Sequence, residues 1–140
     1  MRLFFVMNRT AEQESSRLIP IWLRIVMAIS TISVVIYYSI VPPPGSSAIS
    51  QGPLGILRFS YWLHLISYTG LTIIVGYTTA HVPRPDWQLW VFVIVVGIGV
   101  LIELIQYTIP ARSFSLLDIL VNLVGVLIGI VLLTIFDNFV

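Results

Sequence analysis

Four apolar segments, each close to the length that crosses a bilayer, constrain the fold of this chain more than any other feature. They are residues 18–41, 59–80, 89–107 and 116–136. A helix needs roughly 20 apolar residues to cross about 30 Å of hydrocarbon, at about 1.5 Å of rise per residue. Proline-containing breaks separate the segments, and proline ends a helix because it lacks the backbone donor and clashes with the preceding turn. The sequence therefore predicts an all-α, polytopic membrane protein with four transmembrane helices in one bundle.

The scarcity of charged residues excludes several other classes of protein. Apolar residues make up 58% of the 140 positions and charged residues 9%, whereas soluble domains contain about 25% charged residues. So few charges cannot cover a water-exposed surface, which excludes a soluble enzyme. The net charge of +1 and the lack of a basic, aromatic-interleaved run argue against nucleic-acid binding. With no cysteine, sulfur-based metal sites are excluded, and we expect neither a metal nor a cofactor.

The arginine distribution predicts how the chain is oriented in the cell membrane. Five arginines fall on one side of the predicted spans, namely Arg2, Arg9, Arg17, Arg24 and Arg84. Arg58 and Arg112 fall on the other side. Basic flanks are retained in the cytoplasm, so both termini are predicted to be cytoplasmic, with residues 1–17 as a cytoplasmic segment and 18–140 as the membrane domain. We expect the Arg24 side chain to extend toward the inner headgroups.

Polar residues inside the predicted spans identify the candidate site, because ionisable groups in a bilayer are costly without a partner. Glu103 and Gln106 lie three residues apart, and His64 and Tyr68 four apart, so each pair shares a helix face. Asp118, Asn122, Gly125 and Gly129 form one stripe along the fourth segment. The connectivity places the start of the second segment, the end of the third and the start of the fourth at the same membrane face. These polar residues are therefore predicted to cluster there.

A longer pattern in this region resembles a known family. It reads Glu103-x-x-Gln106, then Pro110-x-Arg112-x-x-Ser115-x-x-Asp118-x-x-x-Asn122-x-x-Gly125-x-x-x-Gly129, and it extends back to His64-x-x-x-Tyr68. The pattern resembles the VanZ-like family of small integral membrane proteins, whose namesake is associated with resistance to the glycopeptide teicoplanin. One departure is visible: the family's usual Asp-Lys pair before the histidine is replaced by Ser60 and Tyr61. The resemblance implies a role linked to antibiotic or envelope-stress tolerance.

Three hypotheses for function follow, and the sequence leaves open whether the first includes catalysis. In the first, an outer-leaflet polar cluster binds or modifies an envelope or lipid headgroup. Glu103 and His64 are then the candidate catalytic residues, and the candidate binding residues are Arg112, Gln106, Asp118, Asn122 and Tyr68. In the second, the chain is a homo-oligomeric, proton-coupled carrier or exporter that uses Glu103 and assembles through its glycines. The third is a purely structural assembly partner, in which the polar residues can be replaced without loss; the first two assign them a role. A metal held by His64, Glu103 and Asp118 is a weaker alternative, because histidine pairs at ligand spacing are missing.

Overall fold

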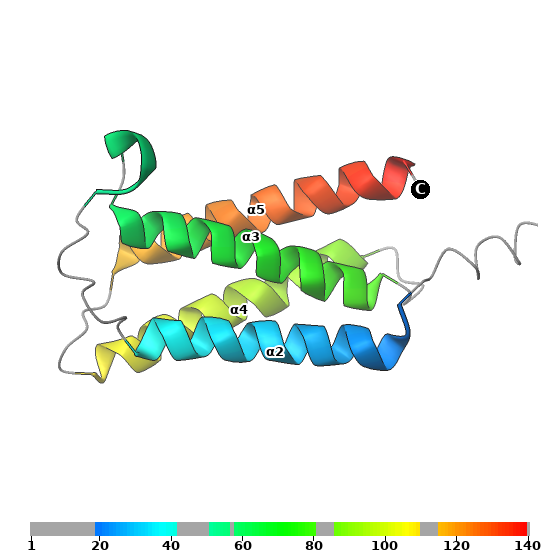
Figure 1. The fold of residues 1–140 in the computed structure, drawn as a ribbon, viewed down its shortest axis with the longest axis horizontal. Helices are drawn as coiled ribbons and strands as arrows, with labels where there is room; N and C mark the ends of the chain where they lie inside the picture. The colour runs from blue at the N-terminus through cyan, green and yellow to red at the C-terminus, as the bar shows by residue number, and fades with distance from the viewer. Residues whose placement is uncertain (1–18, 42–50, 57, 81–85, 110–114, 140) are drawn as a thin grey trace, which may run out of the picture.

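The computed structural model describes residues 19–41, 51–56, 58–80, 86–109 and 115–139. Four long helices lie side by side in this part of the chain and alternate in direction (Figure 1). They are α2 (Ile21–Ile40), α3 (Phe59–Thr79), α4 (Trp87–Tyr107) and α5 (Leu116–Phe139), with a short 3₁₀ helix, η1 (Pro53–Gly55), before α3. Each end of the four predicted segments agrees with a helix end within three residues. The all-α architecture is confirmed.

The centre of the bundle is α3, which packs against each of the other three long helices. Its Tyr68 and Leu71 side chains are buried in the core, where they join Val35 of α2, Val95 of α4 and Val126 of α5. The outward faces of α2, α4 and α5 carry many exposed leucine, isoleucine and valine side chains. Such a surface suits hydrocarbon rather than water. The bundle therefore holds its apolar core around α3 and presents a second apolar surface outward.

Three of the four long helices have the length and composition of membrane spans, namely α2, α4 and α5. The remaining helix, α3, is long enough but too polar for its composition alone to confirm a span. Its central position explains how it tolerates polar residues. Thr69 and Thr72 each donate a hydrogen bond to the carbonyl one turn earlier, at 2.8 and 2.7 Å, so their hydroxyls are satisfied within the helix. The four-span topology remains a prediction.

Two glycines allow α5 to lie directly against α3. A Cβ atom at Gly125 would stand 2.8 Å from the Leu65 carbonyl oxygen, and one at Gly129 would stand 2.6 Å from Cβ of Thr72. The Thr69 hydroxyl also donates to the Gly125 carbonyl at 3.1 Å. This is the close packing that small-x-x-x-small motifs permit in membranes. The hypothesis that these glycines join separate copies is wrong, because they are buried against α3 of the same chain.

Candidate functional site

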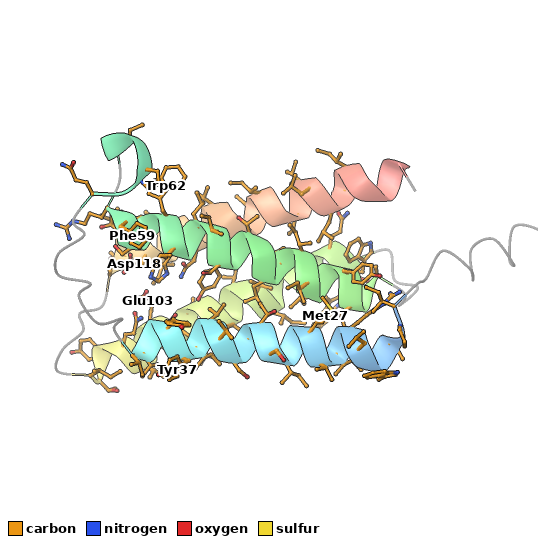
Figure 2. The ribbon with its side chains drawn as sticks, viewed as in Figure 1. Met27, Tyr37, Phe59, Trp62, Glu103 and Asp118 are labelled. Carbon is orange, nitrogen blue, oxygen red and sulfur yellow. The ribbon has the colours of Figure 1, made fainter. Side chains whose placement is uncertain are left out.

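One end of the bundle gathers the polar residues predicted from the sequence. The start of α3, the end of α4 and the start of α5 all lie at this end (Figure 1). The side chains of Glu103 and Asp118 lie there with Phe59 and Trp62, while Met27 lies toward the opposite end (Figure 2). The three helix ends therefore adjoin, as the connectivity predicted.

Glu103 is the most deeply buried ionisable residue of this end, with an exposed fraction of 0%. One of its carboxylate oxygens, Oε2, accepts a hydrogen bond from the backbone N–H of Ser115 at 3.3 Å. The Ser115 hydroxyl in turn accepts a hydrogen bond from the backbone N–H of Asp118 at 3.2 Å, which caps the first turn of α5. The carboxylate thus lies at the partly positive N-terminus of α5, where a negative charge is stabilised.

His64 and Asn122 form a polar link between α3 and α5. The His64 Nδ1 atom lies 2.9 Å from the Asn122 amide oxygen. Since an amide oxygen only accepts hydrogen bonds, Nδ1 is the donor, and Nε2 of the neutral ring is left as an acceptor. Asn122 is 4% exposed, and its amide nitrogen is enclosed without a hydrogen-bond partner among the described residues.

Tyr68 lies beside this pair and reaches across to α4. Its ring stacks on the His64 ring, with 6.3 Å between centroids and 9° between planes. A Cβ atom at Gly99 of α4 would stand 3.0 Å from Tyr68 Cε1 and 3.3 Å from its hydroxyl oxygen. Glu103 follows Gly99 by one helical turn and shares its face. The Tyr68 hydroxyl is enclosed without a hydrogen-bond partner in the described part of the chain.

Comparison with protein families agrees with this arrangement of motifs. The family model VanZ/LLP1 matches residues 2–137, nearly the whole chain. The chain belongs to the VanZ/LLP1 family. No curated protein and no solved structure matches it. The family assignment and the three helices of spanning length and composition identify this VanZ/LLP1 chain as a membrane protein.

The remaining predicted binding residues of the VanZ/LLP1 chain differ in position. Gln106 is 3% exposed, and its amide nitrogen donates to the Ser39 carbonyl at 2.7 Å, so this group fastens α4 to the end of α2. Asp118 is half-buried at the start of α5. Arg112 lies outside the described residues. The structure thus brings together His64, Tyr68, Glu103 and Asn122, which we call the polar cluster.

Two residues of this site were missed as site residues by the sequence analysis. Ser115 donates its N–H to Glu103 and caps α5, and its signal was a serine three residues before an acidic residue at a helix start. Gly99 makes room for Tyr68, but a glycine inside an apolar helix carries no signal for which side chain will approach it. Within the described ranges, no three histidine or acidic residues group closely enough to hold a metal ion.

Proposed function

We propose that this VanZ/LLP1 protein binds an envelope or lipid headgroup in the polar cluster, at the outer leaflet. The observation that supports this most is that two enclosed groups of the cluster, the Asn122 amide nitrogen and the Tyr68 hydroxyl, have no hydrogen-bond partner among the described residues; the Trp62 indole nitrogen at the same end is enclosed in the same way. Buried polar groups are nearly always hydrogen-bonded, so each exception calls for an explanation. Both groups of the cluster can donate a hydrogen bond. A ligand that presents acceptor oxygens, as phosphate, carboxylate and carbonyl groups do, would satisfy them.

An anionic ligand would bind in this cluster only together with a cation, and it would share a proton with Glu103. Glu103 alone would repel an anion, so an anionic ligand needs a cation nearby. His64 can provide that cation when its Nε2 atom is protonated. Arg112 is proposed from the sequence as a second cation, because its planar fork matches phosphate and carboxylate. Glu103 would then accept or exchange a proton with the bound group.

Binding fits the helices better than transport does. Carriers place their substrates near the bilayer midplane and often use interrupted helices. Here the polar cluster occupies one end of the bundle, and α2, α3, α4 and α5 are each described as continuous helices. We extend the proposal to glycopeptide or envelope-stress tolerance as the cellular outcome of headgroup binding.

The sharpest test removes one atom from the cluster. The full chain and the variants Tyr68→Phe and Tyr107→Phe are purified from membranes in mild detergent, and the lipids that stay bound are identified by native mass spectrometry. Tyr107 is 74% exposed at the same end of the bundle, which makes it a matched control. We expect Tyr68→Phe to lose a bound species that Tyr107→Phe keeps. Identical lipids on both variants would contradict the proposal.

A cellular measurement complements the binding test. Glu103→Gln keeps the shape of the side chain while removing its charge, and Asp86→Asn makes the same change at the opposite end of α4, where Asp86 is exposed. At equal membrane levels, we expect Glu103→Gln to lose teicoplanin and envelope-stress tolerance and Asp86→Asn to keep it. Glu103-dependent, proton-driven uptake into vesicles would instead support the carrier hypothesis.

A further inference from the structure

Arg24, at the end of the bundle opposite the polar cluster, is buried against the last turn of α3. Only 6% of the residue is exposed. Its Nε atom donates to the Ile19 carbonyl at 2.9 Å, and its Cζ atom lies 4.3 Å from the centre of the Tyr77 ring of α3. The side chain thus turns toward the residues before α2, the direction expected from the sequence, but it is held against the bundle. The Tyr77 ring and the last turn of α3 hold it there.

The described contacts of Arg24 leave most of its donors unused. A guanidinium has five N–H donors, and the bond to Ile19 uses one of them. No hydrogen bond joins the two terminal amino groups to a described residue. Asp86, at the start of α4 at this end, accepts a hydrogen bond from the Trp90 indole. A buried cation without an anion is costly in a membrane, so a partner from outside the described chain is expected.

The first turn of α2 offers further donors beside Arg24. Its N-cap residue is Pro20, which has no side-chain acceptor, and no side-chain capping bond is formed. The backbone N–H groups of Leu23 and Arg24 both bond to the Pro20 carbonyl. By contrast, the first two N–H groups of a helix have no partner within it, and none is described here for Ile21 or Trp22.

The guanidinium donors of Arg24 and the backbone N–H donors at the start of α2 lie together. The bond from Nε to Ile19 holds the guanidinium next to the residues that begin the helix. Ile21 and Trp22 are 45% and 63% exposed, so the first turn is open to the surroundings. A helix N-terminus favours anions through its N–H groups and its dipole, and a guanidinium fork adds bidentate contacts to phosphate oxygens.

We propose that Arg24 and the first turn of α2 form a phosphate-binding site at the end of the bundle opposite the polar cluster. Its ligand is a phosphate group, and two sources can provide it: an anionic phospholipid of the adjacent leaflet or free inorganic phosphate. The lipid is the better fit, because exposed Trp22 lies in the same turn and tryptophan prefers the headgroup level. This site is independent of the headgroup proposal, since it lies at the other end of the bundle.

The test measures phosphatidylglycerol binding to the full chain in detergent by native mass spectrometry. Arg24→Gln is compared with Arg58→Gln, which removes an exposed arginine at the opposite end. We expect Arg24→Gln to raise the Kd about five- to tenfold and Arg58→Gln to leave it unchanged. Added inorganic phosphate distinguishes the two sources. If the lipid is the ligand, the bound lipid stays in place. If free phosphate is the ligand, the added phosphate displaces the lipid.

A second measurement applies even if Arg24→Gln fails to insert. Guanidinium nitrogens of the unmodified chain are followed by NMR during titration with phosphatidylglycerol and, separately, with inorganic phosphate. The Arg24 signals are assigned by their absence in Arg24→Lys, which keeps the charge but loses the fork. We expect the Arg24 signals to shift with one of the two probes and the Lys variant to bind that probe several-fold more weakly. Arg24 signals that move with neither probe would overturn the proposal.

Discussion

The Nδ1 atom of His64 lies 2.9 Å from the amide oxygen of Asn122, a contact that joins α3 to α5 across 58 positions of the sequence. It is a direct side-chain contact between two residues that belong to separate helices. It also fixes which ring nitrogen of His64 is available to a ligand. The contact thus has two roles: it holds α3 against α5, and it orients the His64 ring. Substitutions can separate these two roles.

Replacing Asn122 tests this contact. In Asn122→Ala, the Nδ1 atom of His64 loses its acceptor, and we expect stability in detergent to fall by about 1 kcal/mol, in the range of polar contacts between membrane helices. Thermal unfolding of the purified chain measures this change. If the contact is real, adding His64→Ala to Asn122→Ala costs less than His64→Ala does alone. Costs that simply add would show that the two side chains do not interact.

The packing of α5 on α3 predicts a strong effect at Gly125. In Gly125→Ala, the new methyl group meets the Leu65 backbone oxygen, which cannot rotate away as a side chain can, so we expect a loss of about 1–3 kcal/mol. Gly97→Ala is the matched control, because a Cβ atom there meets nothing within 4 Å and alanine favours the helix by about 1 kcal/mol. In thermal unfolding, we expect a lower Tm for Gly125→Ala but not for Gly97→Ala.

Gln106 predicts a separation of stability from binding. Its amide nitrogen donates to the Ser39 carbonyl, so Gln106→Leu should lower stability by about 1 kcal/mol through the lost link between α4 and α2. The same variant should retain the lipids that bind in the polar cluster. Unfolding and native mass spectrometry of one preparation give both values. Loss of bound lipid at unchanged stability would instead restore Gln106 as a binding residue.

The helices and the end at which the polar residues meet could be predicted from the sequence, because hydropathy sets helix length and connectivity fixes which ends adjoin. The partners of individual side chains could not. Gln106 and Glu103 share a face three residues apart, yet one contacts α2 and the other contacts the start of α5. Periodicity gives the direction of a side chain from its own helix axis, whereas its partner depends on how neighbouring helices are rotated and shifted. Arg24 illustrates the same limit, since only the position of Tyr77 on α3 explains its burial.

Gly99 allows the position of Tyr68 to be tested without removing any polar atom. In Gly99→Ala, the new methyl group would stand 3.0 Å from Tyr68 Cε1 and 3.3 Å from its hydroxyl oxygen. The ring must therefore shift, and its stacking on His64 must change with it. We expect Gly99→Ala to lose the lipid bound in the polar cluster while the chain still inserts. Gly97→Ala, two residues earlier on the same helix, is again the matched control.

A double substitution separates displacement of Tyr68 from general damage to α4. Tyr68→Leu removes the ring that the Gly99→Ala methyl group would meet. The Tm of the double variant should therefore fall by less than the sum of the two single losses, and it should lie close to that of Tyr68→Leu alone. Lipid binding should stay lost in the double variant, because the hydroxyl group is gone. If Gly99→Ala lowers the Tm equally with and without the tyrosine ring, the contact between α4 and Tyr68 does not position this residue.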